Sequence, residues 1–358
     1  MLLPAGQHLH ALLGDRDGNP VAATAGAPPP AGRGRPRPHP TAGPILGTGV
    51  RRARIVYNPA ARNAPSSERL HAAMRQAPAG WELDLVATEA AGHATALARE
   101  AAAAGFDLVL ACGGDGTVNE AANGLAGSRT ALGVLRGGMG DVFAKEAGIP
   151  RPPERALAAV LEGERRRFDL GTANGRYFLL MAGVGLDAEV VRRVPDAMKR
   201  RLGSTAYVLW GLRLLPGYRA RRTVLRIDGG ERECDLFWLL LGNTRSYGGA
   251  IDVTSRAVVD DGLLDAYVFE GRGLGWAAVT GLRIALHRQD GGRGVDYRRV
   301  RSLEVAAPGI PVQADGEYFG ETPVRFGVAP GALEVMLPKG AAARLFSGSA
   351  ESEASPVS

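Results

Sequence analysis

The sequence has few cysteines and no long apolar run. Two cysteines, Cys112 and Cys234, occur in 358 residues, which excludes a disulfide framework and a multi-cysteine zinc site. No apolar stretch approaches the roughly 18–20 residues that a transmembrane helix requires. The first residues lack the basic segment and the sustained apolar segment of a signal peptide. Together these features favour a protein of the reducing cytoplasm.

Acidic residues are outnumbered by basic ones. The chain has 43 Lys and Arg against 37 Asp and Glu, which gives a net charge of +6. Such a charge favours anionic partners, namely a nucleotide, a nucleic acid or an acidic membrane surface. No recognised nucleic-acid-binding module accompanies this modest excess, so we expect no nucleic-acid partner. The length fits two domains better than one.

Both ends of the chain have the composition of disordered segments. Residues 1–50 are rich in Ala, Pro and Gly, and residues 341–358 end in a polar sequence that contains Ser, Glu and Pro. Neither segment has enough apolar residues to form a core. We therefore expect a disordered N-terminal extension and a disordered tail.

Strands and helices alternate in the first ordered part of the chain, residues 51–168. This alternation predicts βαβ units and a mostly parallel sheet, with ligands beyond the carboxyl ends of the strands. Three turns should lie at that edge, at 58–62, 113–117 and 136–141. The expected strands are 54–57, 81–87, the run before Cys112 and 132–135, and the expected helices are 66–76 and 93–104.

The pattern changes from about residue 168. Short apolar runs separated by Gly and Asp turns predict a second, β-rich domain over 169–325 with few helices. The expected strands are 177–181, 223–227, 236–241, 264–269, 302–305 and 324–328, and the expected helices are 202–215 and 276–287.

The most informative segment is Cys112-Gly113-Gly114-Asp115-Gly116-Thr117-Val118-Asn119-Glu120. Glycines at this place allow positive φ and close approach of a ligand to the backbone. Thr117 and Glu120 form a capping-box pattern, which predicts a helix that starts near Val118. The N-terminus of a helix behind a glycine turn binds anions. Because Asp115 adds a bare carboxylate, the segment favours phosphate binding over an ordinary strand-turn-helix corner.

Three further segments extend this pattern. Arg136-Gly137-Gly138-Met139-Gly140-Asp141 is a second glycine turn between a strand and a helix, and with the first it would present backbone donors to a phosphate. Acidic residues occur downstream at 260–265 and 315–317. Each acidic segment is equally well read as a hairpin turn, since Asp-Gly is a strong hairpin signal. The functional interpretation is that they face the phosphate site, where phosphoryl transfer needs a carboxylate and a divalent cation.

These motifs, together with Asn58-Pro59, resemble the soluble diacylglycerol kinase family, which includes bacterial lipid kinases and the sphingosine and ceramide kinases. The resemblance covers about residues 52–340 and keeps the order of the motifs. It implies a nucleotide-binding α/β domain, then a β-sandwich domain, with residues 326–340 returning to the first domain. It also implies ATP between the two domains, Mg²⁺, and a lipid hydroxyl as the phosphoryl acceptor.

The resemblance assigns roles to individual residues. Asp115 would take part in catalysis, and Asp315 or Glu317 would be the general base, with Glu317 the marginal choice. Asp261 would hold a structural magnesium ion with backbone carbonyls near Val258 and Leu263. The expected ATP contacts are Asn58, Arg62, Thr88, Gly113, Gly114, Asp115, Gly116, Thr117, Asn119, Glu120, Gly138 and Met139.

The chain departs from the family pattern at both nucleotide turns. The second turn of the family usually reads Pro-x-Gly-Thr-x-Asn, where this chain has Arg136, Met139 and Asp141. Loss of the threonine hydroxyl removes a contact worth roughly 0.5–1.5 kcal/mol. The charge of Asp141 should weaken phosphate binding unless a cation or Arg136 compensates. After Asn58-Pro59 the usual Ser-Gly is absent, and Arg62 is a substitute contact for phosphate.

Residues 192–226 are strongly basic, with ten Lys and Arg and one acid, Asp196. Their apolar residues could form one face of a basic amphipathic helix, which suits an anionic membrane surface. A solvated basic helix is the equally weighted alternative.

We therefore expect an ATP-dependent lipid kinase that acts on diacylglycerol or a related lipid. It would be cytoplasmic and peripheral at the inner face of the membrane. An NAD kinase-like enzyme, which shares the Gly-Gly-Asp-Gly turn, and a catalytically weak nucleotide- or lipid-binding homologue are the alternatives. The sequence leaves open whether the chain forms a homodimer.

Overall fold

The computed structural model describes residues 50–203, 205–247, 252–340 and 345–346. Apart from Val50, Leu345 and Phe346, the segments predicted to be disordered at the two ends lie outside these residues. The prediction for the tail is wrong at Leu345 and Phe346, which are buried. The Phe346 ring packs edge-on against Phe168 at 6.4 Å, and the Leu345 carbonyl accepts from the Val259 N–H. Two adjacent apolar side chains are enough to bind this part of the tail to the core.

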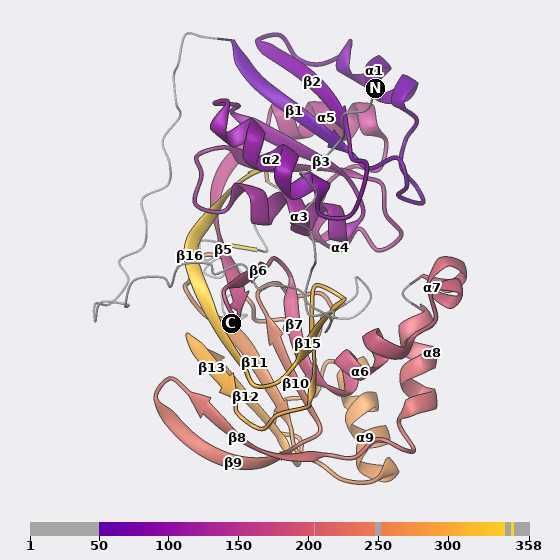
Figure 1. Cartoon of the computed structure of the whole chain (residues 1–358), viewed down its shortest axis with the longest axis vertical. Helices are drawn as coiled ribbons and strands as arrows, with labels where there is room; N and C mark the ends of the chain where they lie inside the picture. The colour runs from indigo at the N-terminus through magenta and orange to yellow at the C-terminus, as the bar shows by residue number, and fades with distance from the viewer. Residues whose placement is uncertain (1–49, 204, 248–251, 341–344, 347–358) are drawn as a thin grey trace, which may run out of the picture. The chain divides into compact units, whose positions relative to one another are not determined.

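The first half of the protein is an α/β unit on a mostly parallel sheet (Figure 1). Its strands lie in the order β2-β1-β3-β4, and all three neighbouring pairs are parallel, as the alternation of strands and helices predicts. α1 packs against α5, and α2 packs against α3. The elements are β1 (Arg51–Tyr57), α1 (Ser67–Met74), β2 (Trp81–Ala87), α2 (His93–Ala103), β3 (Leu108–Gly113), α3 (Asp115–Leu125), β4 (Ala131–Arg136), α4 (Val142–Glu146) and α5 (Pro153–Leu161).

The second half is rich in β-strands, as the sequence pattern predicts, and forms the β-sandwich that the family resemblance implies. One layer is an antiparallel sheet in the order β12-β11-β10-β7-β14-β15, and β16, β13, β8 and β9 form the other. Apolar side chains from both layers, such as Val184, Leu239, Leu225 and Phe326, share one core. The strands are β5 (Glu164–Ala173), β6 (Arg176–Phe178), β7 (Met181–Gly185), β8 (Arg221–Ile227), β9 (Gly230–Leu236), β10 (Trp238–Gly242), β11 (Leu264–Phe269), β12 (Val295–Val300), β13 (Ser302–Val305), β14 (Pro311–Ala314), β15 (Glu317–Glu321) and β16 (Val324–Leu337).

Two strands predicted in this half are each two strands in the structure. The run 236–241 divides at Phe237, because β9 and β10 belong to different sheets. The run 177–181 divides at Leu179 and Leu180, whose N–H groups donate to the carboxylate of Asp315 instead of to a neighbouring strand. An apolar pattern alone does not mark such breaks, since the side chains are buried on both sides of each break.

Helices of the second half cover one side of the sandwich. They are α6 (Leu186–Arg193), α7 (Asp196–Leu202), α8 (Thr205–Leu214) and α9 (Leu274–Ala285). The predicted helix 202–215 corresponds to α8 and the end of α7, which Gly203 separates with a φ of 58°. Among the helices of the described ranges, none is long and apolar enough to span a membrane.

β16 connects the two halves (Figure 1). The first residues of β16 pair with β13, and residues along most of the strand pair with β5. Val335, near its end, pairs in parallel with Leu132 of β4. The parallel sheet of the first half is therefore continuous with one layer of the sandwich. A contact between Asn119 of α3 and Asp315 places the β14–β15 hairpin at the carboxyl edge of the parallel strands.

Candidate functional site

The three predicted turns meet at the carboxyl edge of the parallel sheet. The N–H of Asn58 donates to the Cys112 carbonyl at 2.8 Å, and the N–H of Gly137 donates to the Gly113 carbonyl at 3.0 Å. Asn63 ties the first turn to the third, because its N–H donates to the Gly137 carbonyl at 2.9 Å and its side-chain amide donates to the Gly138 carbonyl.

The glycines of these turns are needed for close packing of two backbones. A Cβ on Gly138 would lie 2.6 Å from the Gly114 Cα, and a Cβ on Gly137 would lie 3.1 Å from the Gly113 Cα. Gly113, Gly114 and Gly116 do not have positive φ, so that part of the prediction is wrong. Close approach is what excludes a side chain at this edge.

α3 starts earlier than its sequence predicts, and the capping box does not form. The helix begins at Asp115, and its N-cap, Gly114, has no side-chain hydrogen bond. Thr117 Oγ1 instead accepts from Asn58 Nδ2 at 3.0 Å. The Glu120 carboxylate accepts from the N–H groups of Gly92 and Ala94, at the start of α2. A glutamate one turn into α3 thus caps the neighbouring helix, which has no capping side chain of its own.

The first turn of α3 consequently presents backbone donors at the edge of the sheet that have no acceptor among the described residues. Its first helical hydrogen bond runs from the Val118 N–H to the Gly114 carbonyl at 3.1 Å. The N–H groups of residues 115–117 therefore point out of the helix end, where the helix dipole also favours negative charge. This arrangement fits the phosphates of a nucleotide, because the glycines leave room for close approach.

Asp115 connects the two glycine turns. Its Oδ1 accepts from the Val142 N–H at 2.7 Å, at the start of α4, and a Cβ on Gly140 would lie 2.7 Å from its Oδ2. Burial raises the pKa of this carboxyl to about 6. Asp115 is therefore not the bare carboxylate that the sequence suggests, since it holds the second turn against the first.

The Asp141 carboxylate has partners within its own turn. Its Oδ2 lies 3.4 Å from Arg136 Nε, and its Oδ1 accepts from the Gly138 N–H at 2.7 Å. The residue has a φ of 47°, which Asp tolerates better than most side chains. The two departures from the family pattern at 136 and 141 thus form one ion pair that stabilises the turn.

The remaining predicted ATP contacts border this edge. Met139 is 41% exposed, and its sulfur lies 3.3 Å from Arg62 Nη1. A Cβ on Gly203 would lie 3.8 Å from the same sulfur, which brings the α7–α8 junction beside the second turn. Thr88 follows β2, and its N–H donates to the Tyr57 carbonyl at 2.8 Å.

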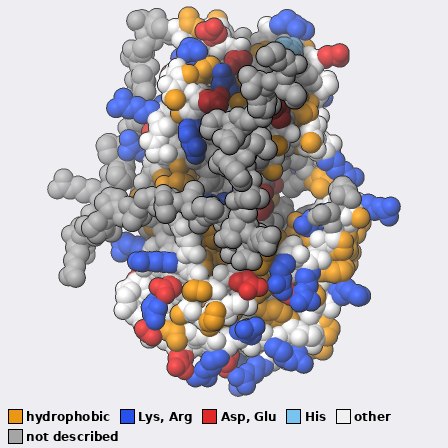
Figure 2. Space-filling view, viewed as in Figure 1, with side chains coloured by type: hydrophobic (Ala, Val, Ile, Leu, Met, Phe, Trp, Pro, Cys, Tyr) orange, Lys and Arg blue, Asp and Glu red, His pale blue; other side chains and the backbone are white. Residues whose placement is uncertain are grey.

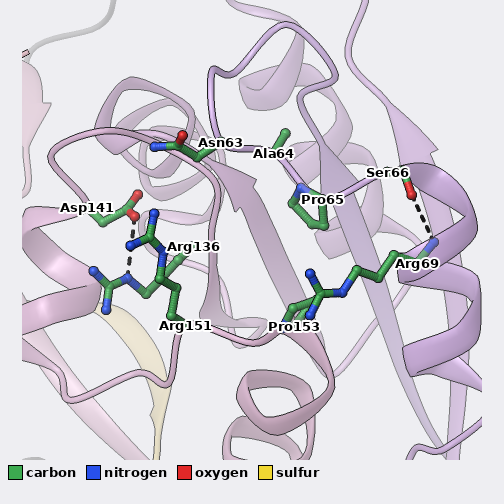
Figure 3. A pocket seen from close by; sticks show the side chains of 9 residues that line it. All are labelled: Asn63, Ala64, Pro65, Ser66, Arg69, Arg136, Asp141, Arg151 and Pro153. Carbon is green, nitrogen blue, oxygen red and sulfur yellow. Dashed lines mark hydrogen bonds and ion pairs between the residues drawn. The ribbon is translucent and has the colours of Figure 1, made fainter.

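A cationic pocket of about 400 Å³ adjoins the second turn (Figure 3). Figure 3 shows the guanidinium groups of Arg136 and Arg151 close to Asp141, with Arg69 farther along the wall. The lining residues are Asn63, Ala64, Pro65, Ser66, Arg69, Arg136, Asp141, Arg151 and Pro153. Arg136 pairs with Asp141 and Arg69 pairs with Glu154. The remaining positive charge, that of Arg151, favours an anionic ligand on this side of the turn.

Asp315, one of the two predicted bases, accepts several hydrogen bonds from within the protein. It accepts from the N–H groups of Leu179, Leu180 and Met181 at 2.7–3.0 Å, and Asn119 Nδ2 donates to its Oδ2. Complete burial raises the pKa of this carboxyl, and the four donors oppose that shift. Because its lone pairs are engaged, Asp315 has no oxygen available for a substrate proton. Asn119, predicted to contact ATP, is likewise used in this contact.

Glu317, unlike Asp315, has an exposed carboxylate. Its side chain is 57% exposed, and a Cβ on Gly116 would lie 3.2 Å from its Oε1. The carboxylate therefore lies over the first turn of α3, although the two residues are 201 positions apart. Arg176 pairs with it at 3.4 Å. Sequence reasoning missed Arg176, because nothing in the local pattern distinguishes it from other surface arginines.

Asp261, the predicted side-chain ligand of a magnesium ion, has an arginine partner in the structure. The carboxylate is paired with the Arg299 guanidinium, and its Oδ1 accepts from the Leu263 N–H at 3.0 Å. Within the described ranges, no group of three or more His, Cys, Asp or Glu side chains could hold a metal ion. Asp261 is the one side chain in the predicted ligand set of Asp261, Val258 and Leu263, so a metal ion bound there would have to displace the Arg299 guanidinium.

The comparisons with known proteins agree with this architecture. A family model described as the diacylglycerol kinase catalytic domain matches residues 52–173, and one described as the YegS C-terminal NAD kinase beta sandwich-like domain matches residues 181–337. A protein named "Diacylglycerol kinase" from Bacillus subtilis (strain 168) is 34% identical over 304 residues, which cover 83% of this chain and 99% of the relative.

Further relatives give the same assignment. A protein of Pseudomonas aeruginosa (strain UCBPP-PA14) named "Probable lipid kinase YegS-like" is 37% identical over 286 residues, covering 78% of this chain and 92% of that protein. A crystal structure of a diacylglycerol kinase from Bacillus anthracis str. Sterne shares the fold, with a TM-score of 0.60 and 21% identity over 82% of this chain and 98% of that one. The chain therefore belongs to the family of diacylglycerol kinases and YegS-like lipid kinases.

Proposed function

We propose that this protein is an ATP-dependent lipid kinase that transfers the γ-phosphoryl group to a lipid hydroxyl, with diacylglycerol as the first candidate. The observation that carries the proposal is the position of Glu317 over the first turn of α3. A proton acceptor and an anion-binding helix end then face the same point. Phosphoryl transfer to a hydroxyl requires this pair of features.

In this proposal the nucleotide phosphates bind where the two glycine turns pack together. The N–H groups of the first turn of α3 would donate to the phosphate oxygens, and Asp115 would keep the second turn in register. Bound ATP supplies the phosphoryl group. Mg²⁺ is expected to bind together with the nucleotide phosphates.

Glu317 would accept the proton of the lipid hydroxyl as the hydroxyl oxygen bonds to the γ-phosphorus and the bond from that phosphorus to the β,γ-bridging oxygen breaks, which releases ADP. Its exposure leaves the carboxylate accessible to a substrate, and Arg176 lies on its other side. The Arg176 guanidinium would orient the carboxylate before the hydroxyl arrives. After transfer, the proton would reside on Glu317 and leave to solvent.

A membrane surface would bind the helices beside this site. Exposed apolar side chains lie on α8 and α9, and the segments 197–227 and 271–289 contain no Asp or Glu. On the face drawn in Figure 2, apolar side chains bordered by Lys and Arg gather on the side where Figure 1 places α7 and α8. The exposed apolar residues are Leu202, Val208, Leu209, Leu212, Leu274, Val279, Leu282 and Leu286.

α8 and α9 would act as one membrane-binding surface. The ring of Tyr218, which follows α8, packs on Phe237 at 5.2 Å, and Phe237 packs on Trp276 of α9 at 5.3 Å. Burial of an exposed Leu or Val contributes about 1.5–3 kcal/mol, and each basic residue at an anionic surface adds about 1 kcal/mol. A lipid bound there would be close to the catalytic edge, because Gly203 lies beside Met139.

The first experiment is phosphorylation of a mixed lipid extract with labelled ATP, read by mass spectrometry. We expect the label on a lipid with a hydroxyl group, and on diacylglycerol when it is the sole acceptor. NAD, offered in a parallel reaction, is the control for the NAD kinase-like alternative. Label on NAD and on no lipid would contradict the proposal. A thermal unfolding temperature that Mg-ATP at millimolar concentration fails to raise would favour the weak binding homologue.

Binding to vesicles tests the membrane surface separately. Leu212→Glu on α8 and Leu282→Glu on α9 should each reduce the fraction bound to vesicles rich in anionic lipid by about tenfold or more, since each removes an apolar contact and adds repulsion. Sedimentation with the vesicles measures this fraction. Val50→Glu, a change at an exposed apolar residue outside the surface, is the matched control. Equal binding of all three variants would refute a role for α8 and α9.

A further inference from the structure

The turn that carries Glu317 has a second support besides Asp315. β14 and β15 are joined at Asp315 and Gly316, with φ of 49° and 79°. The Gly316 N–H donates to Gln313 Oε1 at 2.9 Å. Since Glu317 follows directly, the hydrogen bond at Gly316 fixes the backbone from which its carboxylate extends over α3.

Gln313 is in turn oriented by a buried carboxylate. Its Nε2 donates to Asp187 Oδ2 at 2.9 Å, and the two residues are 2% and 5% exposed. Asp187 lies in the first turn of α6, 126 positions away in the sequence. Gln313 therefore presents its amide nitrogen to α6 and its carbonyl oxygen to the turn.

Asp187 determines which group donates and which accepts in each of these hydrogen bonds. Its Oδ1 accepts from the Ala188 N–H at 2.7 Å, so both of its oxygens act as acceptors. An ionised carboxylate satisfies both donors, whereas an amide at this place satisfies one. Because Asp187 accepts, Gln313 must donate with its nitrogen, and its oxygen is left to accept from Gly316.

We propose that Asp187 and Gln313 are positioning residues that hold Gly316, and through it Glu317, in the geometry for proton transfer. The proposal rests on the function proposed above, in which Glu317 accepts the proton of the lipid hydroxyl. Neither residue contacts substrate in this account. Their role is to keep the base in place, since a displacement of about 1 Å at a reacting group can cost on the order of 100-fold in rate.

The test uses the two single variants Asp187→Asn and Gln313→Glu and the double variant that combines them. In D187N an amide nitrogen faces a donor, so Gln313 must reverse and oppose the Gly316 N–H with its own nitrogen. In Q313E two carboxylates face each other in a buried place. The double variant restores one acceptor and one donor at each contact, because the amide at 187 donates to the carboxylate at 313, which accepts from Gly316.

We expect each single variant to lower kcat for lipid phosphorylation by about 10- to 100-fold, with KM for ATP changed by less than about twofold. The double variant should return to within about threefold of the wild-type kcat. A purely structural role would lower the yield of folded protein and leave the kcat of the folded fraction intact. Single variants with wild-type kcat, or a double variant as impaired as the worse single one, would overturn the proposal.

Hydrogen exchange of the Gly316 amide provides a readout that is independent of activity. The amide should exchange faster in both single variants and return toward the wild-type rate in the double variant. If the wild-type protein phosphorylates no lipid, the proposed function fails, and this exchange pattern still decides whether the chain from Asp187 to Gly316 holds the turn. An unchanged exchange rate in D187N would show that it does not.

Discussion

Glu317→Gln is expected to lower the rate of lipid phosphorylation by about 10²- to 10⁴-fold, the range that removal of a general base typically costs. The amide keeps the size of the side chain and cannot accept the hydroxyl proton. Because Glu317 is largely exposed and its one ion pair is with the exposed Arg176, the variant should fold as the wild type does. The N–H groups of α3 are unchanged, so affinity for Mg-ATP should be retained.

Steady-state kinetics with diacylglycerol, together with calorimetric titration of Mg-ATP, measure both expectations. Glu321→Gln is the matched control, because Glu321 lies on the same strand and also pairs with a single arginine, Arg192, at 3.2 Å. It should keep nearly the wild-type rate. Equal rates for E317Q and E321Q would remove Glu317 from the mechanism.

Asp315→Asn should instead have its main effect on folding. The expected loss is about 3–5 kcal/mol in the free energy of unfolding, because the new amide nitrogen would face N–H donors in a buried place. Asn accepts positive φ as readily as Asp, so the backbone at 49° adds no strain. Urea unfolding followed by circular dichroism measures the loss.

Asp228→Asn is the control for this second variant. Asp228 also lies in a hairpin with positive φ, at 46°, and accepts from the backbone N–H groups of Arg301 and Ser302, but in an exposed place. Its replacement should cost less than about 1.5 kcal/mol. If D315N were as stable as D228N, the four contacts of Asp315 would not hold the hairpin. A folded D315N with no activity would return Asp315 to the candidates for the base.

The sequence was sufficient for the architecture of the first half. Apolar runs such as Leu108–Leu110 that end in glycine, with amphipathic helices between them, specify parallel strands whatever their distant partners are. The three turns at the sheet edge follow from that topology. The second half was less predictable, because the apolar run 236–241 joins the last residue of β9 to β10, and these two strands belong to separate sheets.

The roles of the acidic residues could be predicted only in part. The sequence motifs show that carboxylates are present at Asp115, Glu120 and Asp315, but they do not show which groups these carboxylates contact. Each proves to accept backbone N–H groups from a distant segment, and the separations range from 26 to 136 positions. Glu317 differs by its exposure, which depends on the hairpin turn between it and Asp315. Local patterns carry no information on such contacts.

The pairing of β16 has a consequence for how the chain folds during synthesis. β4 forms its outer ladder with residues near the end of β16, so the parallel sheet has an open edge until residues 324–337 leave the ribosome. A fragment that ends after the first family match, at residue 173, would keep this edge exposed and should aggregate. The first half of the protein is thus first in translation order but among the last parts to be completed.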